Sequence, residues 1–253
     1  MLSQFMDFNA GKFSHIFALL LLIGSFLLIF ILPIITFFIL TDSPYLIENI
    51  NISETVALLS QLPVILVFIV VPFFWYYTVN KLKLKEIFSR IRLVSQNIDE
   101  AFLWGILAAI GIFSLIFAIE IILIIFGLNP QDLSNIPDIQ RLFSWPTIFL
   151  LVSIQPIGEE IFFRGFLFEK IEKHSGSVPA IFFTAFLFGL AHMSYGKIFP
   201  VLMPMVMGVI LGFIVIKTKN LYSAIIAHVV FNVTSLTLAY LGWELLENFA
   251  LIL

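Results

Sequence analysis

Long apolar runs separated by short polar breaks dominate the chain. Seven of these runs suit membrane-spanning helices, and they cover residues 14–41, 56–80, 101–127, 146–171, 178–194, 199–217 and 221–241. Residues 245–253 would add a short eighth element or an interfacial tail. Every backbone polar group in lipid must be satisfied within the protein, and a helix achieves this inside one segment. The pattern therefore predicts an all-α integral membrane protein, a bundle of about seven to eight transmembrane helices.

The composition supports lipid as the solvent of this chain. Hydrophobic residues make up 61% of the 253 positions and charged residues only 11%, whereas soluble domains are about 45–50% apolar and about 25% charged. There is no cysteine, which excludes disulfides, thiolate metal sites and a cysteine nucleophile. The net charge is −3 and no basic stripe follows any helix, so nucleic acid is not expected as a partner.

Basic residues alternate between the connections and assign the two sides of the membrane. They gather in residues 81–100, 169–177 and 217–219, while the intervening connections are mainly acidic. Because cytoplasmic loops carry excess Lys and Arg, we expect these three segments and the N-terminus to be cytoplasmic. Residues 81–100 also read as an amphipathic interfacial helix, with membrane anchoring favoured over substrate docking. The abundance of Phe, Ile, Asn and Lys is typical of a prokaryotic multi-pass plasma membrane protein.

Ionisable residues inside the spans are concentrated in the C-terminal half. Each costs about 2.5–3.5 kcal/mol at mid-bilayer and is a functional hypothesis by default. In the fourth run, Glu160 and Arg164 are four residues apart and can form an ion pair. Glu159 points about 100° away from Glu160, so it need not share that arginine and is a candidate general base. Glu120, which has no motif around it, is interpreted as structural.

Two further pairs follow along the chain. Phe188 and His192 lie near the end of the short run 178–194, where Gly189 would let a neighbouring backbone approach closely. His228 and Asn232 share one face of the last span, where an imidazole and an amide could donate to a single oxyanion. A polar seam between helices explains one such pair, but explains three successive pairs much less well.

The depths of these groups agree. At about 1.5 Å per residue, Glu159 lies about 18 Å, His192 about 21 Å and His228 about 10 Å from the cytoplasmic ends of their runs. Boundary uncertainties of several residues make these values compatible with one band of the bilayer. We therefore expect the pairs to converge on a polar intramembrane cavity. The chain divides into N-terminal transmembrane helices with the amphipathic loop (1–140) and a catalytic helical core (141–253).

In order and spacing, the three pairs resemble the motifs of the CAAX protease and bacteriocin-processing family, also called the Abi family, of intramembrane proteases. The family's Glu-Glu-x-x-x-Arg, Phe-x-x-x-His and His-x-x-x-Asn motifs correspond to Glu159-Glu160…Arg164, Phe188…His192 and His228…Asn232. The resemblance covers roughly residues 145–241 and includes the type II CAAX prenyl endopeptidases, whose eukaryotic members remove the last three residues of prenylated proteins.

The resemblance also implies roles for the residues. Glu159 and His192 would activate the attacking water, His228 and Asn232 would stabilise the oxyanion, and Glu160 and Arg164 would hold the site in shape. Members are described both as zinc proteases and as metal-free glutamate proteases. Glu159, His192 and His228 could form a three-ligand zinc site. The His-Glu-x-x-His spacing of common zinc proteases is absent, however, so metal-free water activation is favoured and zinc stays optional.

The leading hypothesis is thus an intramembrane endopeptidase acting on a membrane-associated peptide or protein, lipidated at a CAAX sequence or resembling a bacteriocin, with membrane lipids as the other partner. The alternative is a non-catalytic scaffold that regulates another membrane enzyme. A transporter is a third reading, but the inverted repeats and matched broken helices typical of transporters are missing.

Overall fold

The computed structural model describes residues 8–43, 53–128, 139–140, 142–195 and 197–250. Within these ranges all regular secondary structure is helical, and six helices are long and apolar enough to cross a membrane. The prediction of a multi-pass helical bundle is confirmed. The elements of the N-terminal half are α1 (Phe13–Phe26), η2 (Leu27–Ile31), α2 (Leu32–Asp42), α4 (Glu54–Thr78), α5 (Leu84–Arg90) and α6 (Ile98–Ile125). Those of the C-terminal half are α9 (Trp145–Glu160), η3 (Ile161–Leu167), α10 (Phe168–Ser175), α11 (Ser177–Leu190), η4 (Met193–Tyr195), α12 (Phe199–Thr218) and α13 (Tyr222–Ala250).

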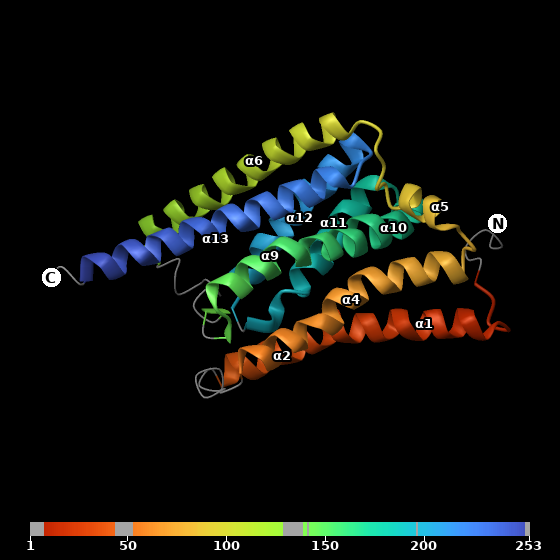
Figure 1. Ribbon diagram of the computed structural model, residues 1–253, viewed down its shortest axis with the longest axis horizontal. Coiled ribbons are helices and arrows are strands. Elements are labelled where there is room, and N and C mark those ends of the chain that lie inside the picture. The colour runs from red at the N-terminus through yellow and green to blue at the C-terminus, as the bar shows by residue number, and fades with distance from the viewer. Residues whose placement is uncertain (1–7, 44–52, 129–138, 141, 196, 251–253) are drawn as a thin grey trace.

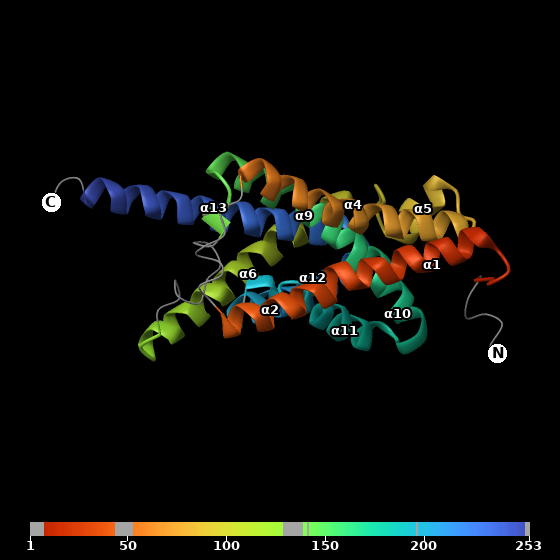
Figure 2. The ribbon, with the colours of Figure 1, turned by 90° about the horizontal axis from the view of Figure 1, so that it is seen from below.

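Several helices are joined end to end. The first span runs from α1 through the π-helical η2 into α2, and the fourth runs from α9 through the π-helical η3 into α10. The fourth span ends at Gly176, whose φ of +83° favours glycine, and the chain turns there into α11. The α9–η3–α10 span packs against α4 and α13, and α11 pairs with α12 (Figures 1 and 2). It is therefore the central helix of the bundle.

Three predicted boundaries are wrong. The run 178–194 is a helix only from Ser177 to Leu190, so at 14 residues α11 is shorter than a full span and His192 lies in the turn that follows it. Residues 245–250 continue α13 instead of forming an eighth element, and 251–253 lie outside the described residues. The amphipathic helix expected over 81–100 is limited to α5, and α6 already begins at Ile98.

Polar contacts join the basic connections at one end of the bundle. Arg90, the last residue of α5, bonds Glu169 of α10 at 3.1 Å, and the Tyr76 hydroxyl donates to the same carboxylate at 3.0 Å. The side-chain amide of Asn220, before α13, donates to the carbonyls of Val94 and Gln96, at 2.9 Å each. Figure 1 shows α5, α10 and the beginning of α1 toward this end. The predicted cytoplasmic connections are thus fixed to one another.

Candidate active site

The paired glutamates lie where the central helix changes its winding. Glu160 is the last residue of α9, and the π-helical segment η3 follows directly. π-helical segments are rare in proteins, and those that occur often lie at functional sites. All seven residues of η3 are buried, including Arg164. The helix therefore carries two carboxylates and one guanidinium into an apolar interior.

Glu160 is the centre of a buried network. Its Oε1 accepts from Arg164 Nη1 at 2.8 Å and lies 2.8 Å from Nδ1 of His228 on α13. The relative exposures of these three residues are 0%, 1% and 2%. Arg164 also lies over the ring of Phe188, with 4.3 Å between the guanidinium carbon and the ring centroid. The predicted Glu160–Arg164 pair is confirmed, and it also anchors His228, which sequence reasoning missed.

Glu159 has no contact with Arg164 of this kind. Its Oε1 accepts from the side-chain amide of Gln155 at 2.7 Å, and its Oε2 lies 3.8 Å from Nε2 of His228. That separation is too long for a direct hydrogen bond. The imidazole of His228 thus lies between the two carboxylates, held by Glu160 and facing Glu159. No Lys or Arg among the described residues forms an ion pair with Glu159, as the helical phase predicts.

His192 is held by the backbone of the preceding turn. Its Nδ1 lies 2.7 Å from the carbonyl oxygen of Phe188, so in the neutral ring Nδ1 carries the hydrogen and Nε2 the lone pair. The Phe188 ring contacts both imidazoles, with centroid distances of 4.8 Å to His192 and 5.7 Å to His228. Glu159 is among the charged groups close enough to act on His192. One aromatic ring therefore separates and aligns the two histidines.

Asn232 is not joined to this network. It is partly buried on α13, one turn beyond His228, and none of the side-chain hydrogen bonds between described residues involves it. The structure thus brings together Glu159, Glu160, Arg164, His192 and His228, and leaves Asn232 at the edge of the group.

Two supporting residues were missed in the sequence. Gln155 is a polar side chain one turn before Glu159, and its i, i+4 spacing could have drawn attention to it. Gly208 on α12 borders the guanidinium, because a β-carbon there would lie 2.9 Å from Nη2 of Arg164. No local pattern identifies Gly208, since the contact depends on how α12 packs. The expected close approach at Gly189 is confirmed, with a β-carbon there only 2.6 Å from the Val201 carbonyl oxygen.

Comparison with known proteins finds one matching family. Residues 141–234 match the sequence model of the type II CAAX prenyl endopeptidase Rce1-like family. The match covers less than half of the chain, so it shows a similarity of this Rce1-like segment to that family. No curated protein and no solved structure matches the chain. The Rce1-like segment contains all six predicted site residues, and the match indicates a protease in general.

The side chains of the Rce1-like segment do not fit a zinc ion as they are arranged. Across the described ranges, no three His, Asp or Glu side chains are placed to hold a metal together. The bond from Nδ1 of His228 to Glu160 leaves Nε2, which faces Glu159, as the one nitrogen of this residue that could bind a metal. The zinc site on Glu159, His192 and His228 therefore stays a prediction, and no step below passes through a metal.

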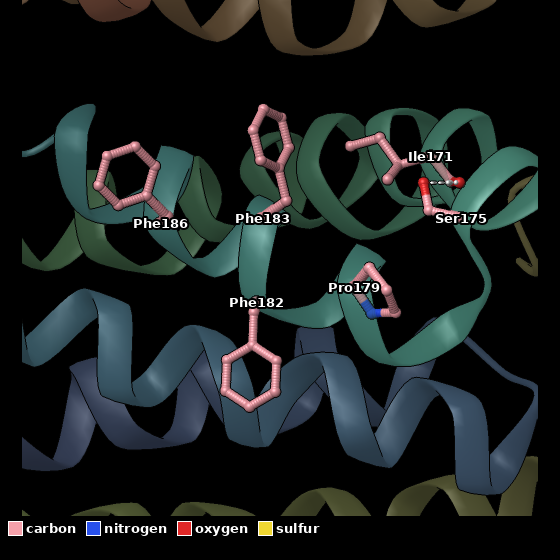
Figure 3. A pocket seen from close by; sticks show the side chains of 6 residues that line it. All are labelled: Ile171, Ser175, Pro179, Phe182, Phe183 and Phe186. Carbon is pink, nitrogen blue, oxygen red and sulfur yellow. Dashed lines mark hydrogen bonds between the residues drawn. The ribbon is translucent and has the colours of Figure 1, made fainter.

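A pocket of about 580 Å³ lies away from this cluster, on the outer side of α10 and α11 (Figure 3). Its lining is almost wholly apolar and includes Phe182, Phe183 and Phe186, each about half exposed. None of the acidic or imidazole side chains of the site lines it. It is therefore not the predicted polar cavity, which stays a prediction.

Proposed function

We propose that this chain is an intramembrane endopeptidase that hydrolyses a peptide bond near the C-terminus of a prenylated, CAAX-type substrate. The observation that carries the proposal is the position of His228 between two buried carboxylates, of which only Glu160 is paired with Arg164. Glu159 is thereby a carboxylate in an apolar interior without a neutralising cation. The Rce1-like match supports CAAX-type substrates over bacteriocin-like peptides.

The formal charges of the cluster are suited to moving one proton. Two carboxylates and one guanidinium leave a charge of −1, which is costly in an apolar interior. A proton on either Glu159 or His228 cancels it, and the two groups face each other at 3.8 Å. With the proton on His228, Glu159 is a free base and Nε2 of His228 is a donor. The pair can therefore supply both functions that hydrolysis requires.

The reaction then proceeds in two steps. Glu159 Oε2 takes a proton from a water molecule oriented by Nε2 of His192, and the resulting hydroxide adds to the scissile carbonyl carbon. Nε2–H of His228 and the amide of Asn232 donate to the oxyanion. When the C–N bond breaks, Glu159 returns its proton to the leaving nitrogen. The products are a carboxylic acid and an amine, and transfer of the acid's proton to the amine gives a carboxylate and an ammonium while the enzyme recovers its starting charges.

The proposal is tested by comparing peptide termini in membranes of cells that carry the wild-type chain or Glu159→Gln. The substitution removes the base, while an amide oxygen can still accept from Gln155. Glu120→Gln is the matched control, because it makes the same change in a span outside the cluster. Terminal labelling and mass spectrometry should find termini that are present with the wild-type and Glu120→Gln proteins and absent with Glu159→Gln.

The positions of these termini within their proteins identify the substrate class. Cuts just after a lipidated cysteine support the CAAX proposal, while cuts elsewhere in small secreted peptides would replace it with bacteriocin-like processing. Identical termini at equal protein abundance would contradict catalysis. A phenotype that is lost on deletion but kept in Glu159→Gln would then favour the scaffold.

A further inference from the structure

Gln155 is a polar side chain in the α9 span that none of the three motifs contains. It is partly buried, and its Nε2 donates to Glu159 Oε1 at 2.7 Å. The terminal torsion of a glutamate is broad, so a carboxylate with no partner can rotate freely. One fixed oxygen removes that freedom. With Oε1 occupied by Gln155, Oε2 is the oxygen that faces His228.

The chemical nature of the side chain that bonds Glu159 matters as much as its position. Glu160 is bonded to a guanidinium, which cancels its charge, whereas Glu159 is bonded to a neutral amide. An amide orients a carboxylate without neutralising it, so Glu159 keeps its capacity to accept a proton. The intervening Pro156 lacks a backbone N–H, and α9 is consequently less restrained between the two side chains. The side-chain bond ties this stretch together.

We propose that Gln155 is a positioning residue that holds the Glu159 carboxylate, so that Oε2 is the oxygen that receives the proton from water. The inference rests on the proposed function, and it deepens that function by assigning a residue outside the family motifs.

The test compares Gln155→Leu and Gln155→Met with Gln61→Leu in the purified protein. Gln61→Leu makes the same substitution in α4, where a partly buried glutamine bonds Ser60 and no carboxylate. The probe is a farnesylated, internally quenched peptide with a CAAX terminus. We expect both Gln155 variants to lower kcat about 10-fold to 100-fold, because the base is misplaced. KM and the melting temperature should stay at the values of Gln61→Leu.

Gln155→Met separates orientation from packing, because it keeps a side chain of similar length and removes the donor without adding a charge. Wild-type kcat in Gln155→Met or Gln155→Leu would overturn the inference. So would a fall in melting temperature together with a rise in KM, since that combination indicates a structural role.

The Glu159→Gln variant distinguishes a failure of the proposed function from a failure of the role assigned to Gln155. Cleavage that persists in Glu159→Gln contradicts the proposed function itself. An inactive Glu159→Gln beside a fully active Gln155→Leu contradicts only the role of Gln155. If the wild-type protein leaves the farnesylated peptide intact, the proposed substrate class is wrong. The Gln155 variants are then scored by the abundance of the termini that depend on Glu159 in cells, with the same expected loss.

Discussion

At the scale of single residues, the two adjacent glutamates have different tasks. Glu160 and Arg164 are fully buried and bonded to each other, so removing either leaves an uncompensated charge in the interior. Breaking such a pair costs about 3–5 kcal/mol. We expect Glu160→Gln and Arg164→Met to lower the melting temperature in detergent strongly, while Glu159→Gln stays near the wild-type value.

The double variant Glu160→Met/Arg164→Met is the control for this prediction. It removes both charges and should be less damaging than Arg164→Met alone, because neither member of the pair is left buried without the other. Equal melting temperatures for Glu159→Gln and Glu160→Gln would contradict the division of tasks.

A second prediction at this scale concerns metal. The proposed base is Glu159 acting with His192, and the described carboxylates and imidazoles do not form a three-ligand set. We therefore expect cleavage of the farnesylated peptide to be unchanged after incubation with 1,10-phenanthroline, with total zinc measured by mass spectrometry on the same sample. Activity that disappears with the chelator and returns with added zinc would establish the zinc site on Glu159, His192 and His228.

At the scale of helices, close packing of α6 on α13 supports the helix that carries His228. A β-carbon at Gly105 of α6 would lie 2.9 Å from Cβ of Ile226 and from the carbonyl oxygen of Ser223. Overpacking of this kind costs about 1–3 kcal/mol. Gly105→Ala should therefore lower both the melting temperature and the activity. Gly111→Ala, on the same helix, meets no atom within 4 Å and should leave both unchanged or slightly improved.

At the scale of the whole molecule, the distribution of basic residues between the two ends of the bundle predicts which end faces the cytoplasm. The connection around α5 is bonded to α10 at one end, and the positive-inside pattern predicts that this end lies in the cytoplasm. The natural chain lacks cysteine, so single-cysteine variants need no altered background. Lys85→Cys and Lys173→Cys should be protected from a membrane-impermeant maleimide in intact cells. Leu128→Cys and Ile198→Cys, exposed near the opposite end, should react.

Membrane disruption before labelling is the control, since all four cysteines should then react. Labelling of Lys85→Cys or Lys173→Cys in intact cells would contradict the predicted orientation.

The sequence by itself predicted the six long apolar spans and the charged pair of the fourth span. A helix that crosses lipid must be long and apolar, and a charged residue within such a run is rare. Both features can therefore be recognised from neighbouring residues in the sequence. The Glu160–Arg164 pair belongs to this class, because four residues on one helix fix their own proximity.

Only the tertiary structure decided that His228 bonds Glu160, 68 residues away, that Gly208 borders Arg164, and that His192 lies beyond the end of its helix. Helices that are apolar on every side carry no stripe that fixes their rotation or their neighbours. Which faces meet, and therefore which nitrogen of His228 faces which carboxylate, is set by side-chain packing between helices distant in the sequence.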